Sequence, residues 1–189
     1  MPGSYSDLVR GGCQLALVAA VLVPTLTIRA DAVVFYARDE ALHLAFPDAE
    51  KVEARDFFLT AEQRVEIERR AKSKVESDLV TVYVGHREGR ITGYAFIDTH
   101  QVRTLPETFM VVLDPKGQVS ATHVLAFHEP TEYMPSARWL QQFKQRNDPG
   151  EIRIGRAIAS MTGSTLTAHA VAGAVRRALA THEILLRKE

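Results

Sequence analysis

Polar and apolar residues alternate through the middle of the chain, as they do in β-strands that bury one face. Runs rich in Val, Ile, Phe, Tyr and Thr stand between short turn sequences, among them Glu88-Gly89 and Pro115-Lys116-Gly117. Turns this short join antiparallel neighbours. The pattern therefore predicts a four-stranded antiparallel meander, with strands at residues 79–85, 90–98, 108–113 and 119–127.

Before the meander, the pattern predicts two helices and two shorter strands. Thr60 and Gln63 have the spacing of a capping box, in which each side chain bonds the other residue's backbone N–H at a helix start. The helix that follows carries only a thin apolar stripe, so we expect it at the surface. The predicted elements are strands at 33–37 and 51–59, the second at a sheet edge, and helices at 40–46, capped by Asp39, and at 61–75.

After the meander, two further helices are predicted. The first follows Pro135 and carries Trp139, Leu140 and Phe143 on one face, which we assign to the core. A turn sequence, Asn-Asp-Pro-Gly, and an extended segment at 152–158 separate it from the last helix. The last helix should lie against the sheet, because it has small apolar residues at helical spacing: Ala170, Val171, Ala174, Val175 and Ala178.

Strands and helices are thus grouped along the chain, which predicts an α+β domain with helices packed on an antiparallel meander sheet. We expect residues 33–189 to form this single domain. Residues 1–32 combine an early arginine, an apolar core and an Ala30-Asp31-Ala32 cleavage sequence, features typical of an export signal. Cleavage and retention as a membrane anchor are both compatible with this segment. Either places the domain outside the cytoplasm, in the periplasm or on the outer face of the cytoplasmic membrane.

Charge argues against nucleic acid as a partner. Lys plus Arg number 23 and Asp plus Glu number 23, so no net charge attracts a polyanion. The basic pairs Arg69-Arg70 and Arg176-Arg177 fall within predicted helices, where we expect them on solvated faces.

Cysteine and histidine usage argue against a metal centre. Cys13 is the only cysteine, which excludes a Cys-ligated zinc site, an iron–sulfur cluster and an intramolecular disulfide from the domain. The 7 histidines show no ligand spacing with an acidic partner. We predict no metal site, and we expect His169 and His182 on the surface of the last helix.

Small hydroxylated residues crowd the start of the last helix, where one hydroxyl would suffice as a cap. A helix start offers free backbone N–H groups and the positive end of the helix dipole, and so binds phosphate readily. A Ser/Thr-rich cap without a ligand would use the same residues, so the cluster alone leaves both interpretations open. Its members are Thr162, Gly163, Ser164, Thr165 and Thr167.

The stretch at 162–171 resembles the flavinylation motif of the FMN-binding domain family, which occurs in the G and C subunits of the Rnf and sodium-pumping NADH:quinone reductase complexes and in exported single-domain relatives. In that motif, Thr162 takes the Ser/Thr place and Gly163 the Gly place. Thr165 takes the place of the threonine that carries FMN through a phosphoester, and Leu166 and Thr167 continue the match. Segments at 41–53, 89–100 and 127–146 are similar to further parts of the family, so the resemblance covers nearly the whole domain.

The motif departs from the family at two positions. Ala159 stands where the family has aspartate, and Ser164 stands where it has alanine. The aspartate belongs to the signature read by the FAD-dependent flavin transferase, which uses magnesium to move FMN onto threonine. The resemblance therefore implies FMN binding and leaves the covalent bond to Thr165 open.

The resemblance also implies where the isoalloxazine ring lies. The candidates are the turn at 129–134, with Glu129 and Thr131, and a sheet edge around Tyr94 or Phe96. Cofactor-binding residues are then expected in this turn and at 162–167, and no catalytic residue is predicted. Glu107 and Thr108 are assigned to a strand entrance instead of the site.

The implied function is electron carriage outside the cytoplasm, between a membrane redox complex and another carrier, after maturation by a flavin transferase. Two other functions remain open. Ala159 favours a non-redox exported interaction module with a degenerate flavin site. A flavin-dependent reductase with its own substrate is the other, although no G-x-G-x-x-G dinucleotide fingerprint occurs in the chain.

Overall fold

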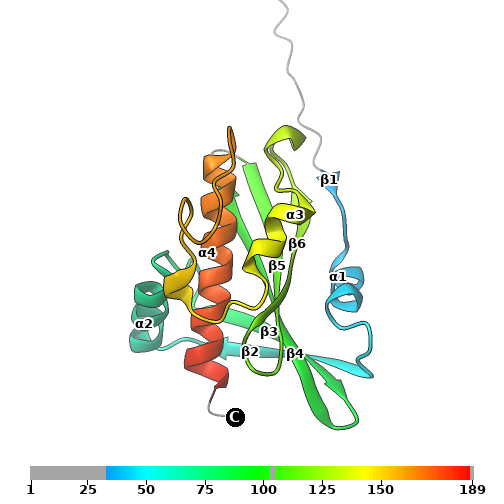
Figure 1. Ribbon diagram of the computed structural model, residues 1–189. Coiled ribbons are helices and arrows are strands. Elements are labelled where there is room, and N and C mark those ends of the chain that lie inside the picture. Colours follow the sequence, from blue (N-terminus) through cyan, green and yellow to red (C-terminus); the bar gives the residue numbers. More distant parts are fainter. Residues whose placement is uncertain (1–32, 103–104, 188–189) are drawn as a thin grey trace, which may run out of the picture.

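A six-stranded antiparallel sheet organises the computed structural model, which describes residues 33–102 and 105–187 (Figure 1). The strand order is β1-β6-β5-β4-β3-β2. Five of the strands follow one another as a meander, and the N-terminal strand pairs with the last of them. The strands are β1 (Val33–Val34), β2 (Lys51–Phe58), β3 (Leu79–Arg87), β4 (Arg90–Val102), β5 (Leu105–Leu113) and β6 (Val119–Phe127).

The α+β prediction is confirmed, and the sheet is larger than predicted. The meander has five strands because the predicted edge strand, β2, pairs along its whole length with β3. β4 and β5 are also longer than the apolar pattern indicated. Their added ends contain polar residues, such as His100 opposite Glu107, which belong to the ladder although they do not extend the apolar run.

The two predicted turns connect the strands as expected. Glu88 and Gly89 both have positive φ, 51° and 72°, as the tight turn between β3 and β4 requires. Between β5 and β6, Asp114 accepts hydrogen bonds at 2.9 Å from the backbone N–H groups of Lys116 and Gln118, and Gly117 has φ 79°. These local interactions hold the register of the meander.

Helices α1 (Arg38–Ala45), α2 (Ala61–Ala71), α3 (Ala137–Leu140) and α4 (Thr165–Thr181) surround the sheet. The Thr60–Gln63 capping box is confirmed at the start of α2. The expected cap of α1 is wrong, because Asp39 lies within the helix and Ala37 precedes it.

The helix after Pro135 ends earlier than predicted. α3 continues only as a 3₁₀ turn, Gln141–Phe143, after which Gln145 takes a positive φ of 66°. The chain then lies beside β6, where the Gln145 N–H donates to the Val119 carbonyl at 2.7 Å. The segment expected to be extended at 152–158 contains only a single bridge, Ile154 to Ile158.

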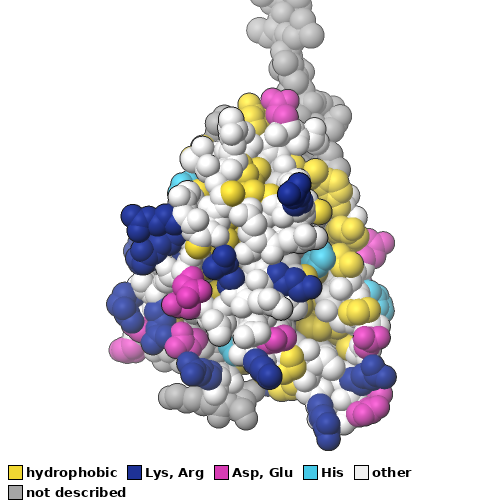
Figure 2. All heavy atoms as spheres, in the orientation of Figure 1, with side chains coloured by type: hydrophobic (Ala, Val, Ile, Leu, Met, Phe, Trp, Pro, Cys, Tyr) yellow, Lys and Arg dark blue, Asp and Glu magenta, His cyan; other side chains and the backbone are white. Residues whose placement is uncertain are grey.

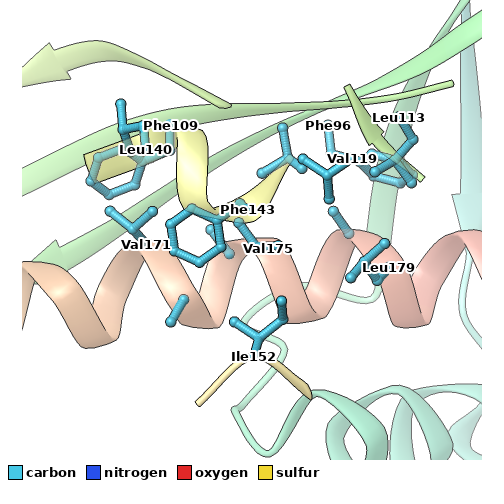
Figure 3. Close-up of a cluster of buried hydrophobic side chains, with 14 of the residues drawn as sticks. Phe96, Phe109, Leu113, Val119, Leu140, Phe143, Ile152, Val171, Val175 and Leu179 are labelled. Carbon is cyan, nitrogen blue, oxygen red and sulfur yellow. The ribbon is translucent and has the colours of Figure 1, made fainter. Parts of the chain in front are cut away.

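Helix α4 crosses one face of the sheet and ends in a π-helical turn, His182–Leu186. Figure 3 shows its residues Val171, Val175 and Leu179 among side chains from the sheet and from the segment around Phe143. Ile152 approaches the opposite side of the helix (Figure 3). α4 is therefore enclosed on both sides, which holds its first turn in a defined place at one end of the sheet.

The predicted solvated face of α4 is wrong for its two arginines. Arg177 is half-buried and makes two 2.8 Å hydrogen bonds to the Asp98 carboxylate on β4. Arg176 donates to the carbonyls of Ala71, at 2.5 Å, and Ile152, at 3.1 Å. Both side chains thus join α4 to its neighbours. His182 is also buried, in edge contact with Tyr94, whereas His169 is exposed as expected.

The predicted export signal, residues 1–32, lies outside the described residues. Within residues 33–102 and 105–187, none of the helices combines the length and the apolar character that a bilayer crossing requires.

Phe143 has a stabilising role that can be measured. Replacement by alanine should lower the free energy of unfolding by about 3–5 kcal/mol, because it leaves a cavity between α4 and the sheet. Val65→Ala on α2 is the matched control, since Val65 is 63% exposed and should change stability by less than about 0.5 kcal/mol. Urea denaturation of both variants tests this, and equal effects would contradict the core assignment.

Candidate functional site

The first turn of α4 has three backbone N–H groups without an acceptor in the described part of the chain. The Ser164 carbonyl accepts the first helical hydrogen bond, from Ala168 at 3.0 Å, and its side chain makes no capping bond. The N–H groups of Thr165, Leu166 and Thr167 therefore have no acceptor among the described residues. A bound anion is the ligand that such a turn accommodates best.

The loop before α4 leaves space for a ligand. Gly163 has φ 78°, and no atom lies within 4 Å of the place where a side chain would begin. Thr162 and Thr165 are exposed, and Leu166 is 49% exposed, so they face solvent at the helix start. Ser164 and Thr167 are buried. The hydroxyl cluster is thus divided into an outer pair and an inner pair.

The turn at 129–134 lies against the start of α4. Glu129 and Tyr133 line a small cavity together with residues of the helix start, including Gly163 and Thr167. The structure therefore brings Glu129 beside the hydroxyl cluster. Thr131 begins the exposed 3₁₀ turn Thr131–Tyr133 and does not line this cavity.

The sheet surface proposed for the ring is not at an edge. Tyr94 and Phe96 lie on β4, a central strand, and both are buried in the core beneath α4. That part of the prediction is wrong. Trp139 and Phe143 belong to the same core, with their rings in edge contact at 5.2 Å, as expected.

Glu107, which the sequence assigned to a strand entrance, also contacts the start of α4. It lies within β5, is 0% exposed, and its Oε1 accepts a hydrogen bond from the Thr167 hydroxyl at 3.3 Å. The other oxygen, Oε2, is buried and has no hydrogen-bond partner among residues 33–102 and 105–187. One signal could have revealed it: with a strand period of two, Glu107 falls on the same face as Phe109 and Val111, which are core residues.

Burial makes Glu107 an unusual carboxyl group. Loss of hydration raises its pKa from 4.5 to about 7, and the nearby Glu129 carboxylate adds to the increase. The hydrogen bond from Thr167 and the neighbouring His100 act in the opposite direction. Glu129 itself has a buried, unpartnered oxygen, Oε1. Two carboxyl groups with unsatisfied oxygens therefore lie beneath the start of α4.

A charged network lies beside Glu107 on the same face of the sheet. Burial alone would raise the pKa of Asp98, but hydrogen bonds with His100 and Arg177 outweigh it and lower the pKa to about 2. One ring nitrogen of His100 bonds to Asp98, at 2.9 Å, and the other is buried with no partner in the described parts of the chain. This network fixes β4 to α4 and positions His100 opposite Glu107.

Ala159, at the position of the motif aspartate, is held through its backbone. The Trp139 indole N–H donates to its carbonyl at 2.8 Å, and its N–H donates to the Gln142 side chain at 2.8 Å. The Ala159 side chain is exposed. In the ranges 33–102 and 105–187, no three His, Cys, Asp or Glu side chains are arranged to hold a metal ion.

A comparison with known protein families found one match. A family model described as the FMN-binding domain matches residues 77–180, more than half of the chain. The match runs from the start of the long strands through nearly all of α4 and includes both the loop at 162–167 and the turn at 129–134. No curated protein matches the chain significantly.

Glu107 should make stability depend on pH. Between pH 4.5 and about 7 the folded protein retains a proton that the unfolded chain releases, so the free energy of unfolding falls as the pH rises through this window. Glu107→Gln removes the buried ionisable group. At pH 8 the variant should therefore be more stable than the wild type by up to about 3 kcal/mol, and the difference should vanish near pH 4.

Denaturation across this pH range measures the effect. Glu132→Gln is the control, because Glu132 lies on the neighbouring turn and is exposed. A constant difference between the wild type and Glu107→Gln at every pH would show that Glu107 does not titrate in this window.

Proposed function

Since this chain belongs to the FMN-binding domain family, we propose that it is an exported flavoprotein that carries electrons between a membrane redox complex and another carrier, with FMN attached through a phosphoester to Thr165. The observation that carries the proposal is the exposed Thr165 hydroxyl beside three backbone N–H groups that have no acceptor among the described residues. A phosphate on Thr165 would lie where these groups can bind it.

The residues of this loop fit the cofactor's phosphate group. Gly163 allows close approach, because nothing occupies the space that a side chain would fill. On the face seen in Figure 2, the upper part, where α4 begins, carries mostly uncharged atoms, and Lys and Arg gather lower and to the left. Backbone amides and hydroxyl groups are therefore the main candidates for compensating the phosphate charge.

Bound FMN supplies one- and two-electron chemistry, and the protein's part is to hold it and set its environment. Thr165 tethers, the amides of the first turn bind the phosphate, and Leu166 offers an apolar contact at the surface. Glu129 and Tyr133 form the facing wall. A covalent tether suits a protein outside the cytoplasm, because a dissociated cofactor would be lost by diffusion.

The motif lies where a flavin transferase could reach it. Thr162 and Thr165 are exposed, and so is Ala159, which replaces the family's aspartate. Because Ala159 is held only through its backbone, a longer side chain there would extend into solvent without disturbing Trp139 or Gln142. The absence of the carboxylate from this signature is the feature that favours the second candidate, a non-redox interaction module with a degenerate site.

Thr165→Val should abolish covalently bound flavin. The protein is produced with its flavin transferase, denatured, and examined by intact mass and flavin fluorescence. Wild type should gain the mass of one FMN less one water, and the variant should gain no mass. Thr92→Val is the control, since Thr92 is exposed on β4 and lies outside the motif. Covalent flavin in Thr165→Val would show that another residue carries the attachment. A colourless wild type would favour the non-redox module.

Ala159→Asp should raise the fraction of protein that carries flavin, because it restores the carboxylate of the transferase signature. The mass ratio of modified to unmodified protein measures this, with Ser160→Asp as a control for added charge at an adjacent exposed position. Equal occupancy in wild type and Ala159→Asp would show that this position does not limit attachment.

A further inference from the structure

We infer that Glu107 takes up a proton when an anion binds at the first turn of α4, so that the site holds phosphate more weakly as the carboxyl group ionises. The inference rests on the proposed function for the identity of the ligand, FMN. The inference adds Glu107 to the candidate site. Its position in β5 had indicated only a structural role in that strand.

The geometry connects Glu107 directly to the helix start. Thr167 provides both ends of the connection, because its hydroxyl donates to Glu107 and its backbone N–H is one of the three without an acceptor. Thr167 is therefore the one residue that connects an ionised Glu107 to an anion bound by that turn. Glu107 is fully buried, so the protein between it and the bound anion screens their repulsion less than water would.

Glu129 makes the repulsion more severe. It lines the cavity that contains Gly163 and Thr167, and one of its oxygens is buried without a partner. With a bound phosphate, two ionised carboxylates would place three anionic groups around one helix turn. A single proton on Glu107 relieves this, because it removes one of the three negative charges and leaves the buried Oε2, which has no partner among the described residues, uncharged.

The other described groups around Glu107 do not neutralise the repulsion between its carboxylate and a bound anion. From β4, His100 faces it with an unpartnered ring nitrogen, while the other nitrogen bonds to Asp98. The positive charge of Arg177 is paired with Asp98 rather than with Glu107. From α4 only the uncharged Thr167 hydroxyl reaches it. The pKa of Glu107, about 7 without ligand, places the proton uptake near neutral pH.

The test measures FMN affinity as a function of pH, with full-length protein produced without the flavin transferase so that binding stays reversible. Below pH 7, Glu107 is already protonated and contributes no pH dependence. Between pH 7 and 9, wild-type affinity should fall by up to about tenfold per pH unit, the limit for one linked proton. Glu107→Gln should remain flat over this range and should bind more tightly than wild type at pH 9.

Two further variants test whether the pH dependence of FMN affinity comes from Glu107. Glu129→Gln removes the neighbouring charge, so Glu107 should ionise at lower pH and the fall in affinity should begin earlier. Glu76→Gln, exposed on the loop between α2 and β3, should behave like wild type. FMN's own phosphate titration occurs near pH 6 and is present in all variants, so the comparison with Glu107→Gln isolates the carboxyl group.

A second readout does not depend on the flavin. Carboxyl ¹³C NMR follows the titration of Glu107 with added sulfate, against chloride at matched ionic strength. Sulfate should raise the midpoint, because it does not titrate in this range and binds as a phosphate analogue. FMN binding without pH dependence, together with an unmoved midpoint, would overturn the inference and leave the proposed function standing. A midpoint raised by sulfate in protein that binds no FMN would support the inference and overturn the proposed function, and failure of both would overturn both.

Discussion

The packing of α4 across the sheet is the constraint on which the rest of the structure depends. Small residues such as Ala168, Ala172 and Ala174 let the helix lie close to the strands, and it is covered on its other side by α2 and Ile152. Arg177 and Asp98 fix its rotation by a bidentate ion pair. Once this position is set, the first turn of α4 has to lie at the end of the sheet where β5 begins and β6 ends.

That end of the sheet combines two opposing electrostatic tendencies. The helix start attracts negative charge, yet Glu107 and Glu129 place carboxyl groups under it. A buried carboxyl group without full hydrogen bonding costs stability, and replacing it by an apolar residue is often neutral or favourable. Its hydrogen bond to Thr167, within the first turn of α4, is what relates it to ligand binding.

Much of this arrangement could be predicted from the sequence, because it depends on local patterns. The alternation of apolar residues located the strands, the Thr60–Gln63 box located α2, and the motif at 162–167 located the start of α4. The predictions that failed concern contacts between segments that are far apart in the sequence. β2 joins the meander through pairing with β3, α3 is shortened by the pairing of Gln145 with β6, and Arg176 is buried by α2. Glu107 was assigned to a strand entrance because its contact with the start of α4 is made through Thr167, 60 residues away in the sequence.

The hydrogen bond between the Trp139 indole and the Ala159 carbonyl has a practical consequence. Trp139 is the only tryptophan in the chain, and this bond ties it to the segment that leads into the helix start. Its emission overlaps the near-ultraviolet absorption of an oxidised isoalloxazine, so resonance energy transfer would quench it when the cofactor is seated. Fluorescence of this single tryptophan would therefore report cofactor binding without an added label.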